Sequence, residues 1–281
     1  MHGISGDIKT VGVIGSGTMG VQIAECMAEH GYQVILKTRN LARKDAILAK
    51  MNKHLFKRGP ESASEILSRI DICSAATDLK GCDLIVESVV EDYEAKSATF
   101  QELRDVIGED TLVATNTSAL SVTRLSESFK GLMGLHFFNP IHRMKLVEIV
   151  TTTSSSQSSI EMLKKLVVSL DKTPIVVIDS PGFLVNKLLL PQINNAIKMN
   201  EAGVATKEEI DQAVKLGLNH SMGPFELADF IGLDVCYFIL NEMYEVSDDP
   251  NYRPASQLKS LVDKGHLGFK TGRGFYEYPR A

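Results

Sequence analysis

The stretch Val11-Gly12-Val13-Ile14-Gly15-Ser16-Gly17-Thr18-Met19-Gly20 decides the fold of this chain. Its first residues are apolar and predict a short buried strand, and the rest has the GxGxxG spacing of a turn that binds dinucleotide phosphates. Gly15 would permit the tight turn, Gly17 would let the backbone approach a pyrophosphate, and Gly20 would let the following helix pack closely on the strand. Because the motif follows a strand and opens a helix, a dinucleotide site is favoured over a purely structural turn.

The start of the helix after this turn would take part in binding. The backbone N–H groups at Thr18 and Met19, with the positive end of the helix dipole, would face the phosphates. An apolar helical period continues from Met19 to His30, Gly31 ends the helix, and Gln33–Lys37 predicts a second strand.

The rest of the first half alternates in the same way. A helical period runs over Tyr93–Val106, between apolar runs that are too short for helices. Strands that alternate with helices predict an α/β fold, a doubly wound (Rossmann-like) parallel sheet with helices on both faces. The expected strands are Thr10–Ile14, Gln33–Lys37, Asp83–Val86, Leu112–Thr115, Leu132–Phe138 and Lys172–Asp179.

The second half predicts a smaller all-helical domain. Pro181-Gly182 opens a long helical segment that ends near Gly203, and strand signals are scarce beyond Asp179. We therefore expect a dinucleotide-binding domain over residues 1–182 and a helical domain over residues 183–281. The further expected helices are Lys207–Leu216, Glu226–Phe230 and Val235–Val246.

Composition narrows the class of protein. The 281 residues are 44% hydrophobic and 23% charged, as in an ordinary soluble globular protein. The net charge of −5 lacks the positive excess that is typical of nucleic-acid-binding proteins, and we expect no nucleic-acid partner. Neither an apolar leader nor a membrane-length apolar stretch is present, so we expect no membrane association and a cytoplasmic location. The four cysteines lack metal-ligand spacing, which predicts buried free thiols and no metal.

The end of the second strand bears on the choice of cofactor. NAD sites usually have Asp or Glu there to bind the ribose hydroxyls, whereas this chain has Lys37-Thr38-Arg39-Asn40, with Thr38 at the acidic position. An arginine can bind a 2′-phosphate that a carboxylate would repel. We expect a preference for NADP(H), with Arg39 and Lys37 on the phosphate and Thr38 as a neutral acceptor, and NAD(H) as the alternative. The competing interpretation is that Lys37 and Arg39 are loop residues whose charges are solvated and have no role in cofactor binding.

A histidine and a glutamate occupy positions where polar side chains are costly. His136 lies in the apolar run Leu135–Phe138 before the turn signal Asn139-Pro140, and Glu148 lies inside the apolar run Met144–Val150. A buried carboxylate needs a partner. A histidine brought back by the turn would be that partner and could act as a general base near neutral pH. On these residues alone, a core histidine bonded to backbone is the competing interpretation.

Together these stretches resemble the short-chain L-3-hydroxyacyl-CoA dehydrogenase family, most closely its single-function bacterial 3-hydroxybutyryl-CoA dehydrogenases. The resemblance covers nearly the whole chain. Its most specific parts are Asn116–Ser118, His136–Pro140, Lys145–Glu148, Pro181–Asn186, Asn219–Pro224, Asp229–Asp234 and Gly272–Tyr276.

The resemblance implies a reaction and roles for the matching residues. The reaction is hydride transfer between NAD(P) and C3 of a short 3-hydroxyacyl or 3-ketoacyl thioester, in the first place 3-hydroxybutyryl-CoA and acetoacetyl-CoA. His136 would be the base, Glu148 would orient it, and Ser118 and Asn186 would hold the substrate oxygens. The helical domain would close over the substrate and form a homodimer. The resemblance also implies that Glu91, Lys96 and Asn139 lie near the cofactor. Lys270 would lie near it when the enzyme is closed.

Besides the missing acidic residue, the helical hairpin after Asn52 departs from the family's pattern, because it is shorter. Lys53, Lys57 and Arg58 could bind CoA phosphates there. They could equally meet an acidic acyl carrier protein that presents a tethered 3-hydroxyacyl group in a biosynthetic pathway. His142-Arg143 is a further difference, which could recognise a polar group of the substrate.

Two other classes of protein stay open. Some 2-hydroxyacid and sugar-acid dehydrogenases on a similar two-domain plan use a lysine of the linking helix as acid or base, and Lys187 follows Asn186 here. The second class is a nucleotide-binding protein without catalysis. Such a protein need not keep Ser118, His136, Glu148 and Asn186 together.

Overall fold

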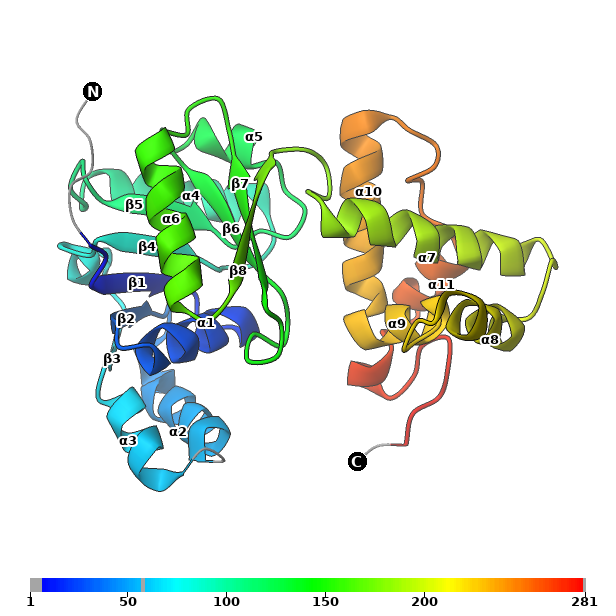
Figure 1. Ribbon diagram of the computed structural model, residues 1–281, viewed down its shortest axis with the longest axis horizontal. Coiled ribbons are helices and arrows are strands. Elements are labelled where there is room, and N and C mark those ends of the chain that lie inside the picture. The colour runs from blue at the N-terminus through cyan, green and yellow to red at the C-terminus, as the bar shows by residue number, and fades with distance from the viewer. Residues whose placement is uncertain (1–6, 57–58, 280–281) are drawn as a thin grey trace. The chain divides into compact units, whose positions relative to one another are not determined.

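The structure is a computed structural model that describes residues 7–56 and 59–279 (Figure 1). The chain forms two compact units, of which the first ends at Asp179 and the second begins at Ser180. This division lies close to the one expected after residue 182. No helix in the described ranges is both long enough and apolar enough to cross a membrane.

Unit 1 is built on one eight-stranded sheet. Its strands are β1 Thr10–Ile14, β2 Gln33–Lys37, β3 Ile70–Cys73, β4 Leu84–Glu87, β5 Leu112–Thr115, β6 Met133–Phe137, β7 Leu146–Thr151 and β8 Thr173–Ile178. They lie in the order β3-β2-β1-β4-β5-β6-β7-β8, and the neighbours run parallel except β6 and β7, which are antiparallel. The expected doubly wound α/β fold is confirmed; the antiparallel pair and strand β3 are additions to it.

Helices cover both faces of this sheet, which explains why its central strands are apolar throughout. The helices of unit 1 are α1 Thr18–Glu29, α2 Lys44–Leu55, α3 Pro60–Leu67, α4 Tyr93–Arg104, α5 Val122–Ser126 and α6 Gln157–Ser169, with the short 3-10 helices η1 Leu41–Arg43 and η3 Ala76–Leu79. In Figure 1 α1 and α6 lie in front of the sheet, and α4 and α5 lie behind it. Val11, Val13, Leu84 and Val86 in β1 and β4 have no exposed surface. Burial of each such side chain stabilises the fold by about 1.5–3 kcal/mol.

The order of the strands reverses at β1, because β2 and β3 lie on one side of it and β4 to β8 lie on the other. In open α/β sheets, ligands bind outside the carboxyl ends of the strands at such a reversal. The segments that follow β1, β4, β5 and β6 carry Gly15, Glu91, Ser118 and Asn139, respectively. The topology therefore brings the predicted site residues of unit 1 to one edge of the sheet.

Unit 2 is helical, as expected. It contains α7 Val185–Glu201, α8 Lys207–Leu218, α9 Pro224–Ile231, α10 Leu233–Ser247, α11 Ser256–Asp263 and the 3-10 helix η4 Phe269–Thr271. Its core includes the fully buried Phe225, Leu240 and Met243. The buried carboxylate of Asp229 accepts hydrogen bonds from the backbone N–H groups of Phe275 and Tyr276, each at 2.9 Å, and so holds the C-terminal segment against α9.

Candidate functional site

The glycine turn after β1 has the shape that dinucleotide phosphates require. A side chain at Gly15, where φ is +111°, would collide with the carbonyl oxygen of Ser88, and a side chain at Gly20 would collide with that of Gly15. At Gly17, the N-cap of α1, a Cβ would meet no atom of the described residues within 4 Å. Gly17 is thus adjacent to open space at a helix N-terminus, where the N–H groups of the first turn have no partner within the helix. The turn fits a bound pyrophosphate.

The side chains at the end of β2 separate onto two faces. Thr38 is 3% exposed, and its Oγ1 lies 2.9 Å from Oγ of Ser16, so it ties β2 to the glycine turn. Arg39 follows it and is exposed. Lys37 is buried and donates to Oε2 of Glu102 on α4 at 3.1 Å. The expectation that Lys37 binds a cofactor phosphate is therefore wrong, because alternate side chains of a strand point to opposite faces.

His136 and Glu148 form a buried pair. They are cross-strand neighbours on β6 and β7, and Nδ1 of His136 lies 2.7 Å from Oε2 of Glu148. The residues are 3% and 0% exposed. Because a carboxylate can only accept, Nδ1 carries the proton and Nε2 is the basic atom of the ring. The predicted contact is present, and it fixes the tautomer that a general base needs.

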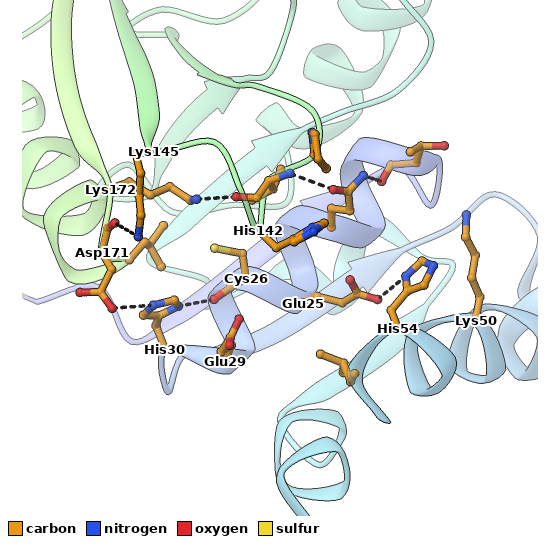
Figure 2. A pocket seen from close by; sticks show the side chains of 16 residues that line it. Glu25, Cys26, Glu29, His30, Lys50, His54, His142, Lys145, Asp171 and Lys172 are labelled. Atoms are coloured by element: carbon orange, nitrogen blue, oxygen red, sulfur yellow. Dashed lines mark hydrogen bonds and ion pairs between the residues drawn. The ribbon is translucent and has the colours of Figure 1, made fainter. Parts of the chain in front are cut away.

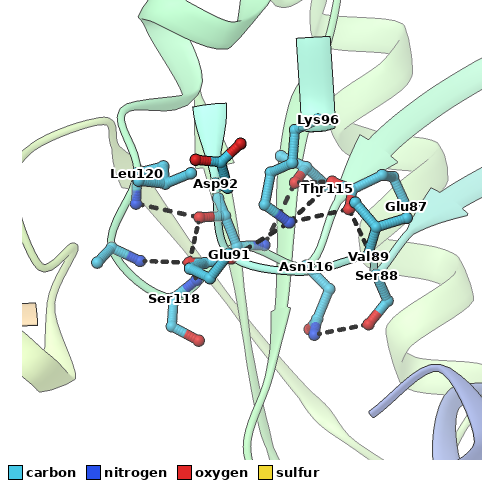
Figure 3. Close-up of polar contacts among 12 residues, drawn as sticks. Glu87, Ser88, Val89, Glu91, Asp92, Lys96, Thr115, Asn116, Ser118 and Leu120 are labelled. Carbon is cyan, nitrogen blue, oxygen red and sulfur yellow. Dashed lines mark hydrogen bonds and ion pairs between the residues drawn. The ribbon is translucent and has the colours of Figure 1, made fainter. Parts of the chain in front are cut away.

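Ser118 and Glu91 meet at the ends of β5 and β4 (Figure 3). Oε1 of Glu91 accepts hydrogen bonds from the backbone N–H of Ser118 at 2.6 Å and from Oγ1 of Thr117 at 2.6 Å. Lys96 is 1% exposed; its Nζ lies 2.9 Å and 3.1 Å from the two oxygens of Glu87 and 3.2 Å from Oε2 of Glu91. Burial alone would lower the pKa of Lys96, but the two carboxylates outweigh it and raise the pKa above its usual value. Lys96 is a charged, enclosed link between two acids.

Asn139 is held by a residue of the first helix. Nε2 of Gln22 on α1 donates to Oδ1 of Asn139 at 3.0 Å, and Oε1 of Gln22 accepts from the backbone N–H of Ile141 at 2.9 Å. The side chain of Gln22 therefore forms hydrogen bonds on both sides of Pro140, in the turn that follows β6. Asn139 is exposed, and its amide orientation depends on Gln22.

The predicted site residues of unit 2 lie at two places within that unit. Asn186 is half-buried in the first turn of α7, and the neighbouring Lys187 is exposed. Lys270 lies in η4, and its Nζ donates to both carboxylate oxygens of Asp234 at 2.6 Å. In this structure the ammonium group of Lys270 is bound to an acid of its own unit.

A cavity of about 610 Å³ runs along α1 in unit 1. Figure 2 shows Lys50 and His54 of α2 at one end and Lys145, Asp171 and Lys172 at the other. The predicted Lys53 is exposed on the same helix as Lys50. The prediction for Lys57 and Arg58 lies outside the described residues. The remaining lining residues are Thr18, Gln22, Glu25, Cys26, Glu29, His30, Leu55, Pro140, Ile141, His142 and Leu170.

Two residues of this site were not found by sequence reasoning. Glu87 ends an apolar strand and is fully buried, yet the expected strand stopped at Val86. The signal was the same as for Glu148, a carboxylate in an apolar run. Gln22 gave no such signal, because its partner Asn139 lies 117 residues further along the chain.

Comparison with known proteins agrees with this geometry. The model of the 3-hydroxyacyl-CoA dehydrogenase NAD binding domain matches residues 10–180, and that of the 3-hydroxyacyl-CoA dehydrogenase C-terminal domain matches residues 182–278. A 3-hydroxybutyryl-CoA dehydrogenase of Clostridioides difficile is 43% identical over 95% of this chain and 98% of its own. The crystal structure of (S)-3-hydroxybutyryl-CoA dehydrogenase PaaH1 from Ralstonia eutropha matches with a TM-score of 0.90 and 37% identity over 98% of this chain and 100% of that one. That of FadB2 from M. tuberculosis matches with a TM-score of 0.93 and 35% identity over the same shares. The chain belongs to the 3-hydroxyacyl-CoA dehydrogenase family.

Proposed function

We propose that the protein interconverts the 3-hydroxy and 3-keto forms of a short acyl thioester, with 3-hydroxybutyryl-CoA and acetoacetyl-CoA as its substrate pair. The observation that carries the proposal is the buried contact between His136 and Glu148 at the edge of the sheet where the glycine turn lies. Family membership and the printed names of the relatives from C. difficile and R. eutropha support the choice of substrate.

In this proposal His136 moves the proton. Its Nε2 takes the proton of the 3-hydroxyl group in the oxidation direction and returns it in the reduction direction. Glu148 keeps Nδ1 protonated and stabilises the imidazolium that forms when Nε2 is protonated. Ser118 and Asn186 hold the substrate oxygens, and such positioning can lower the barrier by several kcal/mol. The bound nicotinamide supplies the hydride acceptor or donor at C3.

We propose a preference for NADP(H) within a family whose N-terminal domain binds NAD. The support is at the end of β2, where Thr38 is uncharged and buried and Arg39 is exposed. Arg43 and Lys44 are exposed a few residues further along the chain. Cations in this segment would attract a 2′-phosphate, and no carboxylate at position 38 would repel it.

We propose that α2 receives the phosphates of the thioester's carrier. Lys44, Lys50 and Lys53 are exposed on this helix, and Lys50 and His54 line the cavity along α1. CoA is the carrier that the family's name suggests. An acyl carrier protein is the alternative, because the same cations would attract an acidic protein surface.

We further propose that unit 2 forms a homodimer contact. A cavity of about 660 Å³ between α7, α8 and α9 is lined mostly by apolar side chains, and Val204 and Leu218 in its lining are 64% and 62% exposed. An apolar hollow with exposed rim residues is typical of a surface that another copy covers. Sedimentation of the purified protein would test this: a monomer at micromolar concentration would contradict it.

The first test is the initial rate of NADPH and NADH oxidation with acetoacetyl-CoA. Turnover with either cofactor supports the reaction, and a higher kcat/KM with NADPH supports the cofactor preference. Cofactor binding without turnover of acetoacetyl-CoA or longer 3-ketoacyl thioesters, on CoA or on carrier protein, would contradict the proposed reaction.

A further inference from the structure

Five residues close to Ser118 form a closed ring of polar contacts, four of them between side chains and one from a backbone N–H. Oε2 of Glu87 accepts from Oγ1 of Thr115 at 2.6 Å, and both oxygens of Glu87 accept from Nζ of Lys96. Lys96 reaches Oε2 of Glu91, and Oε1 of Glu91 accepts from Oγ1 of Thr117. The backbone N–H of Thr117 closes the ring on Oγ1 of Thr115 at 3.3 Å.

The ring lies almost wholly inside the protein. Glu87, Thr115 and Thr117 have no exposed surface, Lys96 is 1% exposed, and the side chain of Glu91 is 27% exposed. Figure 3 shows Glu87, Glu91 and Thr115 near the end of the Lys96 side chain, and Lys96 lies in the first turn of α4. Buried charges that are fully paired and hydrogen-bonded fix one arrangement, because any displacement leaves a charge unpaired in a medium of low dielectric constant.

Glu91, the partly exposed member of the ring, holds the backbone of Ser118, the proposed substrate-binding serine. Oε1 of Glu91 accepts from the N–H groups of Ser118 at 2.6 Å and Ala119 at 3.2 Å. On the opposite side, Oε1 of Glu87 accepts from the N–H of Val89 at 2.6 Å. The two loops that follow β4 and β5 are thus anchored to one ammonium group, that of Lys96.

We propose that Glu87, Lys96 and Thr115 are positioning residues. They hold the carboxylate of Glu91, and Glu91 in turn fixes the backbone of Ser118 in the position that substrate binding requires. The proposal rests on the proposed function, since it takes Ser118 to contact the substrate. It assigns a role to Glu87 and Thr115, and it adds a second role to the one implied for Lys96 near the cofactor: the ammonium group holds Glu91 in place.

The test compares Glu87→Gln and Thr115→Val with the matched control Glu102→Gln. The amide introduced by Glu87→Gln could not accept from Lys96, Thr115 and Val89 at once, and the valine removes both contacts of the Thr115 hydroxyl, the one to Glu87 and the one from the N–H of Thr117. Glu102 lies on the same helix as Lys96 and forms an ion pair with Lys37, outside the ring. We expect both ring variants to lower kcat with acetoacetyl-CoA by about 10- to 100-fold, because small misplacements of a positioning group have effects of this size. The control keeps the wild-type kcat.

Two measurements separate positioning from a general structural effect. Hydrogen exchange of the Ser118 amide should be faster in both ring variants than in the wild type and the control, when each protein is measured at the same interval below its own Tm. In a Ser118→Ala background, Glu87→Gln should lower kcat much less than in the wild type, because the two changes act through the same group. Fully additive effects, unchanged Ser118 exchange, or an equal loss in Glu102→Gln would overturn the proposal. If the wild type turned over no hydroxyacyl thioester, the proposed function would fail while the exchange comparison still decided whether the ring holds Ser118.

Discussion

His136 and Glu148 lie directly opposite each other on antiparallel strands, with Nδ1 of the histidine 2.7 Å from Oε2 of the glutamate. Opposite residues of an antiparallel pair have their side chains on the same face of the sheet, so the pairing of β6 with β7 alone brings the two groups together. Neither residue is exposed by more than 3%. The contact is therefore set by strand register, and the roles proposed for the two residues can be tested one at a time.

Replacement of Glu148 by glutamine should lower kcat by about 100-fold, the scale of one acid–base contribution. The amide keeps the size of the side chain but cannot stabilise an imidazolium, and it can present its NH₂ group to Nδ1 and so favour the wrong tautomer. The KM for acetoacetyl-CoA should change little. Steady-state kinetics of Glu148→Gln and of the control Glu161→Gln, a partly exposed residue on α6 paired with Lys164, would show whether the effect is specific. An undiminished kcat would remove Glu148 from the mechanism.

His136→Gln should lower kcat by about 10²- to 10⁴-fold, while the cofactor still binds. The matched variant is Lys187→Met, which removes the exposed lysine next to Asn186 on α7. It should keep the wild-type kcat, because the proton is proposed to move through His136. Fluorescence titration with NADPH checks binding in both variants. Loss of turnover in Lys187→Met alone would favour the chemistry of the lysine-dependent dehydrogenases.

Local patterns were sufficient to predict the fold. β1, β2 and β5 have the expected bounds because each is an apolar run too short for a helix and bounded by turn residues. β3 was missed because Asp71 interrupts its four residues, and only pairing with β2 makes it a strand. The α11 helix was also missed; its only buried side chain is Leu258, so its apolar pattern is weak.

The site was predictable where a polar residue interrupts an apolar run, as at His136 and Glu148. It was not predictable where the partners are far apart in the chain. Lys37 binds Glu102, 65 residues away, and this contact engages the ammonium group that the sequence had suggested for a cofactor phosphate. Such a contact depends on which helix packs on which face, information that a local window does not contain.

Arg39→Asp should shift cofactor preference from NADPH toward NADH by about 10-fold or more, the effect of exchanging an attractive charge on the 2′-phosphate for a repulsive one. The shift should appear in the ratio of the kcat/KM values for the two cofactors, with kcat for acetoacetyl-CoA reduction almost unchanged. Arg124→Asp, on α5, serves as the control for an added negative charge. An unaltered cofactor ratio in Arg39→Asp would mean that Arg39 is a solvated loop charge.

Gln22→Leu should raise the KM for the cofactor about fivefold, which corresponds to one lost hydrogen bond of about 1 kcal/mol. The leucine cannot bind the amide of Asn139 or the N–H of Ile141, so the Asn139 side chain loses its fixed orientation. Gln157→Leu removes an exposed glutamine bonded to Glu161 and should leave the cofactor's KM at the wild-type value. Equal KM values in all three proteins would show that Asn139 does not need Gln22.

The stability of unit 2 should fall in acid partly through Glu226. Its Oε1 accepts from Nζ of Lys215 at 2.7 Å and its Oε2 from the N–H of Gly223 at 3.0 Å. The hydrogen bond from Lys215 lowers the pKa of Glu226 below the ordinary 4.5; the Gly223 contact adds to this, and burial opposes it. A carboxyl whose folded-state pKa is depressed stabilises the fold above its unfolded-state pKa, and that contribution is lost as the pH falls through the folded-state value.

Glu226→Gln should accordingly have a Tm about 2–4 °C below the wild type at about pH 7, as expected for the loss of a helix-capping contact of about 1 kcal/mol. Below the folded-state pKa, wild-type Glu226 is protonated and resembles glutamine, so the two Tm values should converge. Glu245→Gln, at an exposed position of α10, should follow the wild type at every pH. A Tm difference between Glu226→Gln and the wild type that stayed constant from neutral to acidic pH would show that the charge of Glu226 contributes nothing, and that only the shape of its side chain matters.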